Sequence, residues 1–337
     1  MAATINDIAK KVGVSPSTVS RVMTGNAKIS EETKDRIFAA MDELDYHPNS
    51  IARNLANGSS RTISLILDVA AQDSAFSNIF FSRSIAGIEK STQLKEYSLL
   101  ISGLRSGSLE KTVRNLFLEH KADGLVIPSS LLDRKSADFL NKKKYPFVVL
   151  GEPTIDLVDC DWVDINNSQG SEIAVNHLID KGYGHIAFFG GNGADLFNKY
   201  RVKGYRKAIE RISGEECIYV VETSSDRNEM YKAALDFLGK RSCDAVITND
   251  NISAYCILKA ANELGLNVPS DLGIVTFDNY PLAEYLEPQL TSLDIDTAVQ
   301  GEMAGNILMN KIEDKSALTQ QSLISVKLME RDSSRRN

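Results

Sequence analysis

Four polar residues of this 337-residue chain stand beside short apolar runs, where they could bind a ligand together. Asp164 follows Trp162-Val163, Asn249 follows AVIT, Asp278 follows GIVTF, and Arg201 begins a helical stretch after HIAFFGG. Carboxylates, an amide and a guanidinium that face one cleft can hold hydroxyl groups bidentately, as sugar binding requires. The alternative for each residue is a structural role, either as a loop cap or in a salt bridge between two lobes of the fold.

A second set of polar side chains could contact nucleic acid. In PSTVSRVM, Val19 and Val22 have the i, i+3 spacing of an inward helix face. The outward residues would then carry hydroxyls and a guanidinium, which bind base edges and phosphates. That outward set consists of Pro16, Ser17, Thr18, Ser20 and Arg21.

Two predicted helices must position this second set. Thr4 and Asp7 have the spacing of a capping box for the first helix, and Gly13 favours a sharp turn after it. Ser15 is the next natural cap, with Pro16 at the first helical position. The pattern predicts a helix-turn-helix; a small helical hairpin in an unrelated domain is the alternative.

Two further segments follow this hairpin. Ser30 is expected to cap a third helix, whose apolar stripe contains Ile37, Ala40, Met41 and Leu44. After Pro48, the run NSIARNLANG is only about ten residues long and ends in a glycine and two serines. Helices this short are marginal in water. We therefore expect a partner outside the monomer to stabilise it.

From Arg61 onwards, short β-branched runs alternate with amphipathic stretches, which predicts an α/β fold with two doubly wound parallel sheets. The expected strands are 62–67, 98–103, 124–128, 147–151, 185–191, 218–221, 245–250 and 273–279. The expected helices lie near 80–96, 109–121, 133–143, 167–182, 199–213, 227–240 and 251–265. Ligands of such sheets bind beyond the carboxyl ends of the strands.

Residues 1 to about 60 resemble the DNA-binding end of the lactose-repressor (LacI/GalR) family, through TINDIAKKVGVSPSTVSRVMTG, Tyr46-His47-Pro48-Asn49 and SIARNLANG. In that family two hinge helices pair across a dimer and fold in the minor groove. The resemblance implies that Leu55 wedges into a base step and that Ala52 lets the helices approach. A core leucine is the alternative for Leu55. The implied DNA contacts are Thr4, Ser15, Pro16, Ser17, Thr18, Ser20, Arg21, Asn49, Ala52 and Leu55.

The resemblance also implies a domain organisation. Residues 1–48 would form a helix-turn-helix head, 49–60 a hinge helix and linker, and 61–337 a two-lobed core like a periplasmic binding protein. In the family the chain crosses between the lobes more than once. Accordingly, we expect the first lobe at about 61–163 plus 291–320, and the second at about 164–290 plus 321–337.

The same resemblance places an effector site in the core. Asp164, Arg201, Asn249 and Asp278 match positions where the family holds its effector. The resemblance further suggests ring stacking on a sugar by four aromatic residues, although core packing is the alternative for each: Phe76, Phe80, Phe81 and Trp162. FSNIFF, FVVLGEP, DWVDINN and FFGG together look most like repressors of maltose or maltodextrin operons in Gram-positive bacteria.

Charge is distributed unevenly along the chain. The net charge is -7, yet residues 1–60 contain seven basic and seven acidic residues, so the remainder carries the whole excess. Residues 1–30 alone are +3. Only this front end suits phosphate binding.

Several other classes of protein lack sequence support. Four cysteines without metal-like spacing, no leader and no long apolar run predict a reduced, cytoplasmic protein. The glycines at 190, 191 and 193 lack the third glycine of a dinucleotide fingerprint, and there is no phosphate-binding G-K-[ST] or G-x-S-x-G motif. The four histidines show no paired spacing. We therefore expect no enzyme, cofactor or metal.

These patterns together predict a homodimeric repressor that a small effector, expected to be a sugar, releases from a pseudo-palindromic operator. The C-terminus MERDSSRRN lacks the apolar heptads of a tetramerising tail. One alternative is a family regulator that needs a phosphoprotein or purine-like corepressor. Another is a cytoplasmic sugar-binding or sugar-modifying protein with a vestigial head.

Overall fold

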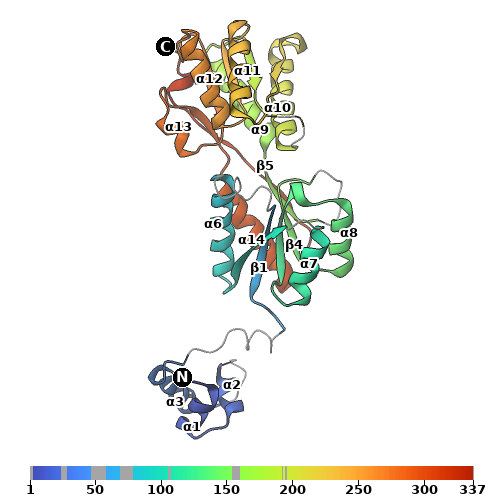
Figure 1. The fold of residues 1–337 in the computed structure, drawn as a ribbon, viewed down its shortest axis with the longest axis vertical. Helices are drawn as coiled ribbons and strands as arrows, with labels where there is room; N and C mark the ends of the chain where they lie inside the picture. Colours follow the sequence, from blue (N-terminus) through green and yellow to red (C-terminus); the bar gives the residue numbers. More distant parts are fainter. Residues whose placement is uncertain are drawn as a thin grey trace. The chain divides into compact units, whose positions relative to one another are not determined.

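The computed structural model describes residues 3–23, 29–46, 58–68, 79–104, 108–153, 160–191, 193 and 196–336. The chain forms two compact units (Figure 1). The first contains the N-terminal helices, and the second contains almost all of two β-sheets. Among the residues described, none of the helices has the length and apolar character that crossing a membrane would require.

Three helices make up the N-terminal unit, as predicted: α1 (Ile5–Val12), α2 (Pro16–Met23) and α3 (Glu31–Glu43). The Thr4 N–H donates to Asp7 Oδ2 at 2.8 Å, and the Gly13 φ of +78° ends α1. The Thr18 N–H donates to Ser15 Oγ at 3.2 Å, so Ser15 caps α2. These local bonds fix the turn between α1 and α2.

One small apolar core holds the three helices together. It consists of Ile8, Ala9, Val12, Val19, Val22, Ile37 and Ala40. Arg36 of α3 also donates from Nη2 to the Val12 carbonyl, at 2.7 Å, where α1 ends. The outward face of α2 is therefore carried on a fixed scaffold.

The first sheet has the order β11-β5-β4-β3-β1-β2 (Figure 1). Its strands are β1 (Thr62–Asp68), β2 (Ser98–Leu104), β3 (Gly124–Pro128), β4 (Phe147–Leu150), β5 (Trp162–Ile165) and β11 (Gln321–Ile324). The helices are α6 (Ile79–Gln93), α7 (Leu109–Leu118), α8 (Arg134–Lys143) and α14 (Thr297–Glu313). Apolar side chains of α6 and α14 share one core with alternate residues of β1, β3 and β4.

The second sheet has the order β12-β10-β9-β8-β6-β7. Its strands are β6 (Ile186–Phe189), β7 (Tyr219–Val221), β8 (Ala245–Thr248), β9 (Gly273–Phe277), β10 (Thr291–Asp294) and β12 (Lys327–Met329). One face packs on α9 (Asn167–Asp180) and α10 (Leu196–Ser213), the other on α11 (Arg227–Gly239) and α12 (Asn251–Glu263). The short α13 (Pro281–Tyr285) and three 3-10 turns, Ser129–Leu131, Glu215–Cys217 and Asp332–Ser334, complete the described elements.

This α/β architecture agrees with the predicted fold class, but the strands at the crossings differ from the expected boundaries. β10 was expected in the first lobe, yet it extends the second sheet parallel to β9. β11 was expected in the second lobe, yet it pairs with β5 in the first sheet. β12 runs antiparallel to β10, so the second sheet is mixed. The backbone N–H and C=O groups at the open edges of β9 and β5 need hydrogen-bond partners, and β10 and β11 supply them.

Close packing of α6 against α14 supports a first prediction. A Cβ on Gly301 would lie 2.1 Å from the Ser84 carbonyl oxygen, whereas a Cβ on Gly239 would meet nothing within 4 Å. We expect Gly301→Ala to lower the free energy of unfolding by about 1 to 3 kcal/mol, because the two helices must separate. Gly239→Ala should be neutral or slightly stabilising, since alanine favours helix. Urea unfolding followed by circular dichroism measures both, and equal stability of the two variants would contradict the packing.

Candidate nucleic-acid interface and ligand site

The leading turn of α2 presents hydroxyl groups that already interact with one another. Ser15 Oγ lies 2.8 Å from Ser17 Oγ and 2.8 Å from Thr18 Oγ1. Pro16, Ser17, Ser20 and Arg21 are exposed, and Thr18 is half-buried. The predicted face is therefore accessible, and its hydroxyls are held in a defined arrangement beside the N-terminus of a helix, where phosphate oxygens are attracted.

Several predicted contacts lie outside the described residues. Asn49, Ala52 and Leu55 belong to this group, as does Phe76. The backbone of Phe80 is described as part of α6, but its side chain is not. The roles assigned to these residues remain predictions.

Arg201 is the centre of the candidate ligand site at the carboxyl ends of the second sheet. Its side chain is buried, and its Nε donates to Asn167 Oδ1 at 2.8 Å. Its Nη1 donates to the carbonyl oxygen of Asn249, the residue after β8. Its Nη2 lies 3.7 Å from Oδ1 of Asp278, the residue after β9. Three of the four predicted polar residues are thus brought together.

Aromatic rings enclose the guanidinium from two directions. Its carbon lies 4.0 Å from the ring centroid of Phe277 and 5.0 Å from that of Phe197. Burial lowers the pKa of Arg201, but the neighbouring carboxylates, Asp278 first, oppose this shift. A guanidinium keeps its proton in proteins, and charge-assisted hydrogen bonds are strong in a buried environment of low dielectric constant.

Asp278 has an unusual backbone and an unusual carboxyl group. Its φ is +72°, in the left-handed region that non-glycine residues rarely adopt and that is found at ligand sites. Burial raises its pKa to about 6, although the positive charge of Arg201 acts in the opposite direction. Among the described residues, its Oδ1 accepts no hydrogen bond. This oxygen can accept a hydrogen bond from a hydroxyl group of a ligand.

Asn249 offers a second acceptor next to it. The residue is buried, and its N–H donates to the Phe189 carbonyl at 3.0 Å, which extends the pairing of β8 with β6. Within the part of the chain that the structure describes, its side-chain Oδ1 accepts no hydrogen bond. An amide and a carboxylate, both with an available acceptor atom, therefore flank one guanidinium donor.

Asp164, the fourth predicted polar residue, and Arg201 act on each other's pKa through their charges. Asp164 is inside β5 rather than beyond the strand, and its carboxylate accepts the N–H groups of Glu152, at 3.0 Å, and Ile165, at 2.7 Å. Burial raises the pKa of Asp164, and these two hydrogen bonds oppose the rise. The short run DWVDI gave too little signal for a strand. The role of Asp164 in effector binding stays a prediction.

Two of the predicted aromatic residues are described in full. Phe81 packs against the core of the first sheet, as its alternative interpretation expected. Trp162 is half-buried in β5, two residues before Asp164 and therefore on the same face of the sheet. The structure brings neither ring into contact with Arg201 among the interactions it describes.

The sequence analysis missed two groups at the site. Phe197 lies one helical turn before Arg201 on α10, and 41% of it is exposed. The i, i+4 spacing of an aromatic residue and an arginine was the available signal. Tyr280 is the other. Burial is the main cause that raises its pKa and the negative charge of Asp278 is the second, whereas Thr297 and Arg83 lower this pKa. Thr297 and Arg83 belong to α14 and α6 of the first lobe, so residues of both lobes act on the pKa of Tyr280.

Relatives of this chain are bacterial regulators. Residues 4–49 match "Bacterial regulatory proteins, lacI family", and residues 175–334 match "Periplasmic binding protein-like domain". The HTH-type transcriptional regulator MalR of Staphylococcus xylosus is 30% identical over 98% of this chain and 97% of its own length. Catabolite control protein A of the same organism is 31% identical, over 87% of each chain.

Solved structures of regulators share the fold. The lac repressor dimer bound to operator and the anti-inducer ONPF has a TM-score of 0.83 at 24% identity, covering 99% of both chains. The regulator CelR in complex with cellobiose has a TM-score of 0.71 at 24% identity, covering 98% of this chain and 99% of that chain. With a DNA-binding family matched at the N-terminal helices and a regulator matched along nearly the whole length, the chain belongs to the lacI family of bacterial regulatory proteins.

Proposed function

We propose that this protein is a transcriptional repressor of a carbohydrate operon, released from operator DNA when a sugar binds beside Arg201. The observation that carries the proposal is the group of Arg201, Asn249 and Asp278, in which one buried guanidinium lies beside two side-chain acceptor atoms that accept no hydrogen bond from any described residue. Neighbouring hydroxyls of a sugar both donate and accept hydrogen bonds, so they complement such a group. The exposed ring of Phe197 offers an apolar face for the sugar ring.

DNA binding is assigned to the N-terminal helices. Ser17, Thr18, Ser20 and Arg21 would face the major groove, and the N–H groups at the starts of α1 and α2 would bind phosphates. We infer a homodimer on a pseudo-palindromic operator, and the similar structure of the lac repressor dimer bound to operator supports this inference. Such a regulator works in the cytoplasm, and its relatives are regulators rather than enzymes.

A sugar of the maltose or maltodextrin type is the proposed effector. The relative MalR and the structure named as a probable maltose operon repressor from Staphylococcus support this choice. Residues of both lobes, Arg83 and Thr297 of the first and Arg201 of the second, act on the pKa of Tyr280, so we infer that a ligand beside it can favour one arrangement of the lobes. The ligand can shift the repressor only through a difference in affinity between those arrangements.

A corepressor is the second candidate. Catabolite control protein A is also a relative, and so are several PurR repressors, which are 26 to 28% identical to this chain. A regulator of this kind would gain DNA affinity, rather than lose it, when its phosphoprotein or purine-like ligand binds.

A gel shift with a palindromic duplex containing a central CpG, with and without maltose, separates the possibilities. Loss of the shifted band with maltose supports the proposed repressor. A band that appears only with a purine base or a phosphoprotein supports corepression. If no duplex is shifted at any salt concentration, the protein does not act on DNA, and a cytoplasmic sugar-binding or sugar-modifying role would remain.

A further inference from the structure

A groove of about 560 Å³ lies on the second lobe, along the exposed side of α10. Its lining on the helix has the spacing of a single helical face, because the residues recur every three or four positions. They are Asn198, Lys199, Val202, Lys203, Arg206, Lys207 and Glu210. Arg201 points to the other side of the same helix, where it contacts Asn249. The groove is therefore separate from the proposed sugar site.

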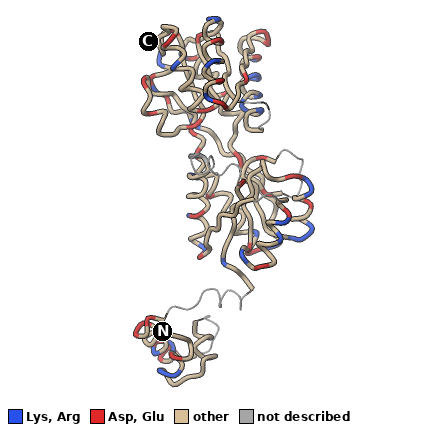
Figure 2. The backbone as a smooth tube through the Cα atoms, in the orientation of Figure 1, with Lys and Arg blue, Asp and Glu red and all other residues tan. Residues whose placement is uncertain are grey.

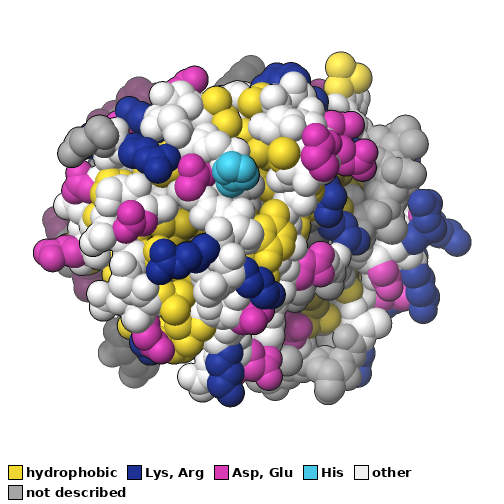
Figure 3. Space-filling view, turned by 90° about the horizontal axis from the view of Figure 1, so that it is seen from above, with side chains coloured by type: hydrophobic (Ala, Val, Ile, Leu, Met, Phe, Trp, Pro, Cys, Tyr) yellow, Lys and Arg dark blue, Asp and Glu magenta, His cyan; other side chains and the backbone are white. Residues whose placement is uncertain are grey.

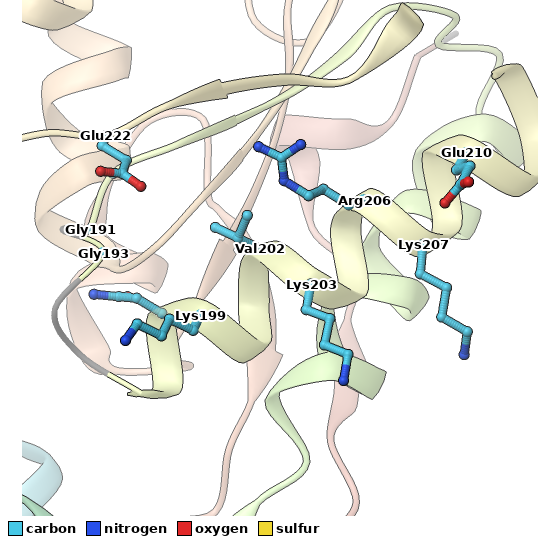
Figure 4. Close-up of a pocket in the computed structure, with 11 residues that line it drawn as sticks. Gly191, Gly193, Lys199, Val202, Lys203, Arg206, Lys207, Glu210 and Glu222 are labelled. Carbon is cyan, nitrogen blue, oxygen red and sulfur yellow. The ribbon is translucent and has the colours of Figure 1, made fainter. Parts of the chain in front are cut away.

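Positive charge is concentrated in this groove. Figure 4 shows basic side chains on successive turns of α10, with Arg206 directed towards the Glu222 side and Lys203 and Lys207 towards the other side, and several positions along α10 are blue in Figure 2. Lys207 pairs with Glu172 at 3.0 Å. For Lys199, Lys203 and Arg206, no ion pair is formed with any residue that the structure describes. On the face in Figure 3, by contrast, acidic and basic side chains are interspersed.

Three glycines, at 190, 191 and 193, also line the groove. Gly190 and Gly191 have φ values of +108° and +74°, and the Thr223 N–H donates to the Gly191 carbonyl at 3.0 Å. A Cβ on Gly191 would lie 2.7 Å from the Asn198 amide carbon, and one on Gly193 would lie 3.2 Å from Glu222 Oε1. Side chains at these positions would intrude on the wall, so the glycines keep this end of the groove open.

Two carboxylates limit what can occupy the groove. Glu222 lies at the end beside Gly193, and Glu210 lies at the other end of the helical face (Figure 4). A long polyanion such as a DNA strand would be repelled at both ends. A compact anion can lie between them, beside Lys199, Lys203 and Arg206, which span about 10 Å of helix. The carboxylates could then accept hydroxyl groups of the same molecule.

We propose that this groove binds a small phosphorylated metabolite, separately from the sugar site. Phosphate is favoured because lysines and an arginine supply many donors and positive charge within one concave surface. The volume lies in the range of small-molecule sites. The chain as a whole carries a net charge of -7, so this local excess of cations is not a general property of its surface.

Calorimetric titration of the full-length protein with inorganic pyrophosphate at constant ionic strength tests the proposal. We expect saturable binding to the unmodified protein, and at least tenfold weaker binding by Lys203→Gln/Arg206→Gln. The control Lys142→Gln/Lys143→Gln removes two charges from the end of α8 and should bind within twofold of the unmodified protein. The charge-preserving variant Lys203→Arg/Arg206→Lys should bind within threefold, which shows that folding is intact.

Two further measurements test where pyrophosphate binds and which kind of ligand the groove accepts. Arg201→Gln should retain pyrophosphate binding, so a failure of the sugar site leaves this result intact. Absence of saturable binding, or equal weakening in the α8 control, would overturn the proposal. Displacement of pyrophosphate by random duplex DNA or by poly-glutamate at matched charge would overturn it too, because the groove would then belong to a macromolecule.

Discussion

Replacing Arg201 with glutamine is expected to weaken sugar binding about 100-fold or more. The side chain is buried and donates to Asn167 and Asn249, so its loss removes the charged donor of the site and leaves Asp278 without a positive neighbour. Losing a charged hydrogen-bond partner in a desolvated site costs about 2 to 5 kcal/mol, and about 2.7 kcal/mol corresponds to 100-fold. Calorimetry with maltose measures the change.

Arg206→Gln is the matched control for this prediction. It removes the same charge from the same helix, but from the exposed side that lines the groove. We expect its maltose affinity to stay within twofold of the unmodified protein. The Arg201 variant should still shift duplex DNA, but maltose should no longer release the duplex. Equal sugar affinity for both variants would remove Arg201 from the site.

Sugar affinity is also expected to depend on the protonation of Asp278. Burial raises the pKa of this carboxyl to about 6 in the free protein. Hydroxyl groups that donate to Oδ1 favour the ionised form, so a bound sugar should lower this pKa and release a proton. Affinity should therefore fall about tenfold as the pH drops from 7 to 5, since one pKa unit corresponds to a factor of ten. Asp278→Asn should bind more weakly at pH 7 and lose this dependence.

The contribution of Asp278 to the stability of the unliganded protein should change with pH in the opposite direction to the sugar affinity. Because the pKa is higher in the folded than in the unfolded chain, Asp278 contributes stability at pH values below about 4 that is lost as the pH rises through 6. The free energy of unfolding of the unmodified protein, minus that of Asp278→Asn, should therefore decrease over this interval. Denaturant unfolding at several pH values provides the check, and a difference that increases with pH would contradict the raised pKa.

Local sequence signals predicted the helix-turn-helix well. Thr4, Gly13 and Ser15 act on their own neighbours through caps and a turn, and the structure confirms each of these roles. Most of the strands also followed from short apolar runs: GLVIP was predicted at 124–128, the range that β3 occupies. Such features depend on residues that are close together in the chain, so a single sequence contains them.

Features that depend on distant parts of the chain were harder to predict. β10 pairs with the open edge of β9, and β11 pairs with the open edge of β5. The residues of β10 and β11 alone do not indicate which of these edges each strand will join. The same holds for Tyr280, whose pKa is affected by Arg83 and Thr297 on α6 and α14. Arg201, Asn249 and Asp278 were predictable because parallel strands bring their carboxyl ends to one edge of the sheet.

The central claim is that a sugar bound beside Arg201 controls DNA binding by the N-terminal helices. Its most direct test is fluorescence anisotropy of a labelled duplex, selected from a random pool by the full-length protein, titrated with protein at zero and at saturating maltose. The proposed repressor predicts a Kd for the duplex at least tenfold higher with maltose, and an unchanged Kd for Arg201→Gln. If maltose binds, as calorimetry would show, and the Kd of the unmodified protein for the duplex stays the same, the two sites are not coupled and the repressor mechanism is wrong.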